Sequence, residues 1–160
     1  MIIENLKYCQ EHKGLHISGY VIMSNHIHLL ASAEEGNESI SAIIRDFKKH
    51  TSKEMIRMIN EISESRREWL LELFKKYGIE DSDNKNYKVW QSGNHPTLLW
   101  TLKHMWKNLG YIHNNPVKAG YVYDAKDYLY SSALTYEDES KGLLKIDLLP
   151  IISEVEWKML

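Results

Sequence analysis

The segment Leu15–Ser32, LHISGYVIM-SN-HIHLLAS, consists of two apolar, β-branched runs on either side of a short polar turn. This arrangement is typical of a β-hairpin. Upstream of it, apolar residues recur at helical spacing from Ile2 to Cys9, and Lys13-Gly14 supplies the basic last turn and glycine that end many helices. The pattern predicts a helix over Ile2–His12, followed directly by the hairpin.

Downstream of the hairpin, helical spacing returns and is interrupted twice. The predicted elements are helices within Glu38–Tyr77 with a break near Ser63–Ser65, a loop over Gly78–Asn86, a short strand over Tyr87–Gly93 and a helix over Thr97–Asn114. If one more strand preceded the first helix, the order of elements would be βαββαβ, followed by a further helix. We therefore expect an α+β fold: a ferredoxin-like antiparallel sheet with helices on one face and an extra C-terminal helix, its first strand apparently absent from this chain.

The composition indicates one domain in a reducing compartment. A chain of 160 residues with 43% hydrophobic residues is predicted to form a single domain over residues 1–160, with 124–160 as an acidic C-terminal tail. The one cysteine, Cys9, excludes an internal disulfide. The sequence has neither an apolar run of eighteen residues nor a signal-peptide pattern at its start, so we expect a cytoplasmic protein without a membrane partner.

The net charge of −2 hides a strong local imbalance. The forty residues Asn84–Tyr123 contain no Asp or Glu and carry five lysines, so this window is +5 and the rest of the chain is −7. The net charge gives no composition argument for a nucleic-acid partner, but any part of the protein that must avoid acidic side chains lies in this window.

A second basic feature lies in the first of the helices expected within Glu38–Tyr77. Arg45, Lys49, Lys53 and Arg57 follow one another at intervals of four residues, which places four cations in one row on the helix surface. Such a row either binds an anion or is simply a solvated helix face, and charge patterning alone does not decide between the two.

The pattern His-Ile-His stands in the second half of the hairpin. Strand alternation places His26 and His28 on one face, with Ile27 on the other. Two neutral imidazoles side by side form half of a site for a divalent cation. Taken alone, this spacing favours two surface or hydrogen-bonded histidines over a metal site.

Tyr111 lies on the polar side of the last predicted helix. It shares a line with His104, Lys107, Asn108 and Asn115. A phenol is a poor nucleophile unless a cation or a base activates it, or unless its electrophile is strongly polarised. The neighbouring Gly110 costs the helix about 1 kcal/mol relative to alanine. Either close approach of a partner or a packing requirement explains that glycine.

Four segments together resemble one known family: VIMSNHIHLL at 21–30, WQSGNHP at 90–96, YIHNNPVKAG at 111–120 and DYLYSSA at 127–133. In order and spacing they are similar to the single-tyrosine HUH transposases of insertion sequences, and in particular to the REP-associated tyrosine transposase branch. The resemblance covers most of the chain, from about Ile2 to Ala133.

The resemblance implies a role for individual residues. His26 and His28 would bind a divalent metal, Mg²⁺ or Mn²⁺, and Asn115 would complete the metal site. Tyr111, on the catalytic helix, would attack single-stranded or hairpin DNA, leaving a 5′-phosphotyrosine and a free 3′-OH. In such a transposase the acid-free window would lie against the DNA.

Further residues are candidates for DNA binding on their charge or aromatic character. They are Arg45, Lys49, Lys53 and Arg57 of the basic row, with Trp90, His95, Lys103, Lys107 and Lys118 of the acid-free window. Trp100, Tyr87 and Trp106 are other aromatic side chains that could stack on bases, although Trp106 is better explained as core. A homodimer is possible, because a missing first strand favours pairing with a second chain.

Two other functions remain open at this stage. One is a non-catalytic relic of such a transposase that binds DNA hairpins without cutting them. The other is a small metal-dependent phosphoesterase that uses the two histidines to activate water, with Tyr111 in a structural role.

Overall fold

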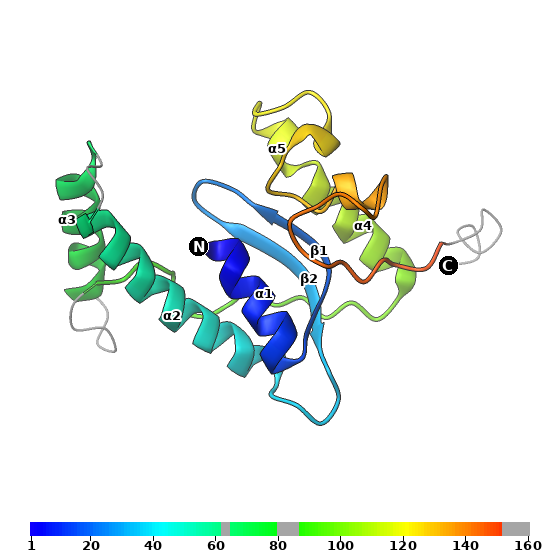
Figure 1. The fold of residues 1–160 in the computed structure, drawn as a ribbon, viewed down its shortest axis with the longest axis horizontal. Coiled ribbons are helices and arrows are strands. Elements are labelled where there is room, and N and C mark those ends of the chain that lie inside the picture. Colours follow the sequence, from blue (N-terminus) through cyan, green and yellow to red (C-terminus); the bar gives the residue numbers. More distant parts are fainter. Residues whose placement is uncertain (62–64, 80–86, 152–160) are drawn as a thin grey trace.

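A computed structural model of the chain describes residues 1–61, 65–79 and 87–151 (Figure 1). The two strands are β1 (Leu15–Ile22) and β2 (Ile27–Ala33). The α-helices are α1 (Ile2–Lys13), α2 (Ile40–Glu61), α3 (Arg67–Ile79), α4 (Leu102–His113) and the single-turn α5 (Asn115–Lys118). Two short 3₁₀ turns follow, η1 (Ala125–Asp127) and η2 (Leu134–Tyr136). The α+β class and the predicted hairpin are confirmed.

The hairpin contains a β-bulge that changes which face each residue of β1 occupies. Leu15 to Ile17 pair in one register and Gly19 to Ile22 in the next, so that Ser18 is an extra residue in β1. A bulge of this kind shifts the strict two-residue alternation. As a result Ile17 and Tyr20, three residues apart, both lie in the same buried cluster.

The two faces of the hairpin pack against different helices. One face covers a core built with α1 and α2: Leu6, Cys9, Leu15, Ile17, Tyr20, Ile43, Phe47 and Leu144. The other face presents Val21 and Leu30 to Ile112 of α4. The sheet therefore lies between α1 and α2 on one side and α4 on the other, while α3 extends away from it (Figure 1).

Gly19 lets α4 approach the sheet closely. A Cβ added to Gly19 would collide with Cδ1 of Leu109, a buried residue of α4. The hydroxyl of Ser132 and the side chain of Leu30 enclose the same position. The close packing of α4 against the sheet thus depends on the absence of a side chain at Gly19.

We expect Gly19→Ala to lower the free energy of unfolding by about 1–3 kcal/mol, because the added methyl group overpacks a closed site. Urea denaturation measures this change. Gly110→Ala is the matched control, since no atom lies within 4 Å of a Cβ at that position. A Gly19→Ala protein as stable as the parent would refute this account of the close packing.

The C-terminal segment covers the outer edge of β1. Tyr130 O accepts from Ile22 N, Ser132 N donates to Tyr20 O, and Asp147 N donates to Ile17 O. Trp106 of α4 donates its indole N–H to Pro150 O at 2.9 Å. The described part of the acidic tail, through residue 151, is therefore bound to the sheet and to α4.

The structure corrects two of the predicted elements. Residues 87–93 do not form a strand, and the sheet of the described residues contains only β1 and β2. Instead, Trp90 lies against Phe47 and donates its indole N–H to Thr51 Oγ1 at 3.0 Å, which fixes the segment to α2. The last long helix begins at Leu102 rather than Thr97, because Thr101 caps it by accepting from His104 N.

The ends of the other helices agree closely with their predicted positions. α1 ends one residue later than expected, and α2 and α3 flank the predicted break. Parts of that break and of the predicted loop, residues 62–64 and 80–86, lie outside the described residues, as does the end of the tail, 152–160. Within the described ranges, no helix is both long and apolar enough to cross a membrane.

Candidate functional site

Two histidines of the hairpin face α4. His28 of β2 is paired with Val21 across the sheet and lies on the same face as Leu30, which packs toward α4. His26 stands two residues earlier, and the two rings meet edge to face with centroids 4.9 Å apart. The predicted alternation of the two imidazoles therefore holds in the structure.

Two further residues of this site, Tyr111 and Asn115, come from α4 and the start of α5. The Tyr111 ring meets the His28 ring edge to face at a centroid distance of 5.4 Å. Asn115 Oδ1 lies 3.3 Å from His26 Nε2, and His26 Nδ1 lies 2.7 Å from Asn25 Oδ1. Four residues that the sequence placed in two distant segments thus form one cluster.

The donor set suits a divalent cation. Two imidazoles and an amide oxygen are borderline and hard donors of the type that bind Mn²⁺ or Mg²⁺ with positions left for other oxygens. Burial and the nearby His26 lower the pKa of His28, which keeps this imidazole in the neutral form that metals require. No group of three or more His, Cys, Asp or Glu side chains suited to a metal occurs in the described ranges, and the oxygen that lies beside the two imidazoles is Asn115 Oδ1.

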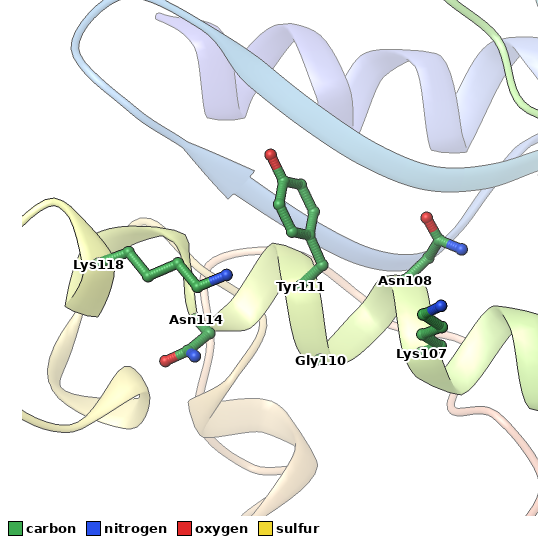
Figure 2. A pocket seen from close by; sticks show the side chains of 6 residues that line it. All are labelled: Lys107, Asn108, Gly110, Tyr111, Asn114 and Lys118. Carbon is green, nitrogen blue, oxygen red and sulfur yellow. The ribbon is translucent and has the colours of Figure 1, made fainter.

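A pocket of about 560 Å³ opens beside Tyr111. Its lining residues are Lys107, Asn108, Gly110, Tyr111, Asn114 and Lys118. Figure 2 shows the Tyr111 side chain directed from α4 toward the strands of the hairpin, with Lys118 reaching toward it from α5. The Lys118 ammonium lies 5.4 Å from the centre of the Tyr111 ring, and Tyr111 is 50% exposed.

The basic row on α2 is not part of this cluster. α2 packs on the face of the sheet opposite α4, and all four members of the row are exposed. Arg57 forms ion pairs with Glu54 and Glu61 at 3.0 and 2.7 Å, and Arg45 forms one with Asp46. Pairing with acids of the same helix favours the solvated-face interpretation for these two arginines.

The remaining candidates are spread along the approach to α4. Trp90 is partly buried, and its indole N–H is used by Thr51, so it acts as an anchor. His95 is exposed in the extended segment before α4, where Trp100 is 82% exposed and is the better candidate for base stacking. Lys103 lies partly buried in the first turn of α4.

Two features of this region were not apparent from the sequence. Lys48 donates to Gln91 O and Gly93 O at 2.7 Å each, which fixes the segment leading to α4. Backbone acceptors leave no trace in a sequence pattern. Asn114 lines the pocket, and its spacing of three residues from Tyr111 was the signal that could have revealed it.

His113 does not belong to the basic surface. It lies near Ser132 Oγ at 2.8 Å and against Tyr136, and burial lowers its pKa to about 4. At neutral pH it is an uncharged packing residue, so the acid-free window owes its positive charge to lysines.

Comparisons with known proteins agree with the resemblance seen in the sequence. The family described as transposase IS200 like matches residues 1–92, more than half of the chain. A putative REP-associated tyrosine transposase of Haemophilus influenzae is 27% identical over 122 residues, which is 76% of this chain and 61% of the relative. The chain therefore spans about three fifths of the length of this curated relative.

The fold has a counterpart among solved structures. The structure of the REP-associated tyrosine transposase bound to a REP hairpin aligns with a TM-score of 0.58 at 20% identity, covering 96% of this chain and 75% of that one. The family match contains His26 and His28 and ends before α4, so the part of the site on α4 rests on the geometry described above. On its sequence, this chain belongs to the IS200-like transposase family.

Proposed function

We propose that this protein is a DNA strand transferase of the REP-associated tyrosine type, in which Tyr111 attacks a phosphodiester of single-stranded or hairpin DNA. The observation that carries the proposal is the contact between the Tyr111 and His28 rings, at 5.4 Å, within the same cluster as His26 and Asn115. A nucleophile next to a metal donor set is what metal-assisted phosphoryl transfer requires.

In the proposed reaction, Tyr111 Oη forms a bond to the phosphorus and the bond from phosphorus to the 3′ oxygen breaks. The phenol loses its proton and the leaving 3′ oxygen takes one up, so that the products are a 5′-phosphotyrosine and a free 3′-OH. One phosphodiester replaces another, so a second DNA end can accept the strand without ATP. Tyr111 thus serves as the catalytic nucleophile.

His26, His28 and Asn115 would hold Mg²⁺ or Mn²⁺, which when bound supplies Lewis-acid polarisation of the phosphate oxygens. His28 contributes a neutral imidazole, since its pKa is lowered. Asn25 lies 2.7 Å from His26 Nδ1, so a hydrogen bond between them can fix the ring with Nε2 toward Asn115. All four groups belong to one chain, so the proposed site is complete without a second copy.

DNA as the substrate is supported by charge and by the relatives. The lining of the pocket beside Tyr111 contains two lysines and no acid, within a window of forty residues that lacks Asp and Glu. The similar solved structure is that of a transposase bound to a REP hairpin. We therefore infer that this chain acts on a hairpin with an adjoining single strand.

The test uses the full chain, Mn²⁺ and hairpin oligonucleotides with single-stranded flanks. We expect a covalent protein–DNA adduct that survives SDS, seen as a slower band on a denaturing gel. Binding without cutting would favour the non-catalytic relic. Metal-dependent cutting without an adduct would favour the phosphoesterase and exclude the tyrosine mechanism.

A further inference from the structure

Gly110 occupies the interior of α4 without a structural reason. A glycine at such a position destabilises a helix relative to alanine. Its φ is not positive, unlike that of Gly120 or Gly93, so the backbone conformation does not require glycine. Apart from the adjoining residues and the backbone of α4 itself, no atom of the described residues lies within 4 Å of a Cβ built there, whereas a Cβ at Gly19 meets Leu109. Packing therefore does not explain Gly110.

The same glycine forms part of the pocket beside Tyr111. Lys107 lies three residues before Gly110 and Lys118 follows on α5, so that the two ammonium groups flank the bare helix backbone (Figure 2). The amides of Asn108 and Asn114 complete the polar lining. The lining is cationic and offers hydrogen-bond donors, which are the groups that recognise phosphate.

We propose that the surface over Gly110 is a subsite for one sugar–phosphate unit of a DNA strand, next to the unit presented to Tyr111. The strand backbone lies against the helix backbone at Gly110, within reach of Lys107 and Lys118. DNA as the ligand rests on the proposed function above. The pocket volume, about 560 Å³, lies within the range of small-ligand sites and suits such a unit.

Two variants test whether the absent side chain matters. In a Tyr111→Phe background, which holds DNA uncut, Gly110→Ala should raise the melting temperature by about 2–4 °C while weakening the binding of a single-stranded oligonucleotide. Gly110→Leu should weaken binding about tenfold, the equivalent of one lost charge-assisted hydrogen bond. Fluorescence anisotropy measures the affinity. Ser41→Leu, at an exposed position on α2, is the control and should leave affinity unchanged.

The salt dependence of oligonucleotide binding tests whether a phosphate occupies the subsite. Lys118→Gln should reduce the slope of log affinity against log salt concentration by about 0.7, the value for one phosphate contact on a single strand. In the Gly110→Leu background the same change should have little further effect, because the phosphate is already displaced. If Lys118→Gln reduced the slope equally with and without Gly110→Leu, the subsite would be refuted.

The experiments distinguish failure of the proposed subsite from failure of the proposed strand-transfer function. Unchanged affinity in Gly110→Leu, or a parent protein that does not bind single-stranded DNA, overturns the subsite whatever Tyr111 does. A protein that forms no adduct yet loses affinity in Gly110→Leu keeps the subsite and refutes only the strand-transfer chemistry.

Discussion

Replacing Tyr111 with phenylalanine is expected to abolish the SDS-resistant adduct, lowering the rate of DNA cutting by about 10³-fold or more. Phenylalanine keeps the ring that meets His28 and Lys118 and removes only the oxygen that would form the phosphotyrosine. The side chain is half exposed, so we expect hairpin affinity and stability to change little. Denaturing gels measure the adduct, and anisotropy measures the affinity.

Tyr123→Phe is the matched control for this experiment. Tyr123 also lies in the acid-free window and is fully exposed, with no part in the cluster around His28. Its adduct yield should equal that of the parent protein. If Tyr111→Phe still formed the adduct, another nucleophile would have to be found, and the tyrosine mechanism proposed here would be wrong.

Replacing His26 with alanine is expected to reduce cutting at least about 100-fold while much of the hairpin affinity remains. The change removes one of the three proposed donors and also the group that lies 3.3 Å from Asn115 Oδ1. The proposed DNA contacts come chiefly from lysines outside the donor set, so DNA binding should survive. Calorimetric titration with Mn²⁺ should show a weaker site, and a large excess of Mn²⁺ should restore part of the cutting.

His104→Ala distinguishes this loss from a general effect of removing a histidine. His104 is exposed on α4 and belongs to neither the donor set nor the pocket lining. We expect it to cut DNA and bind Mn²⁺ as the parent does. If His26→Ala cut DNA as fast as the parent, its role as a metal ligand would be refuted.

The hairpin and its histidine pair could be predicted because the information is local. An apolar run, a polar turn and a two-residue period determine which side chains share a face. The bulge at Ser18 could not be predicted in the same way, because Tyr20, Val21 and Ile22 are apolar on both faces of β1, so the pattern after Gly19 does not show the register.

The proximity of Tyr111 to His28 was accessible only through the resemblance. Helical spacing placed Tyr111 on a polar side, but the packing of α4 against the hairpin depends on long-range contacts such as Gly19 with Leu109. The role of Trp90 was undetermined for a similar reason. A tryptophan in a basic window fits base stacking, and only the fold shows that Thr51 accepts its N–H.

The ion pairs of the arginines on α2 follow from the sequence itself. Arg57 has acids at positions three before and four after it, which is the spacing of helical ion pairs. The spacing of these acids therefore predicts pairing within the helix, which the spacing of the cations alone does not. The start of α4 was misplaced for a comparable reason, since Pro96 is a good helix start but Thr101 supplies the actual cap.

The contact between His26 and Asn115 joins residues 89 positions apart in the chain. Contacts between such distant segments carry the largest loop-closure cost and belong to the slow, non-local steps of folding. The hairpin alone holds only two donors, and α4 alone holds only the tyrosine. Under the proposed function, a nascent or partly opened chain would therefore lack the complete site, which would form only once α4 has docked on the hairpin.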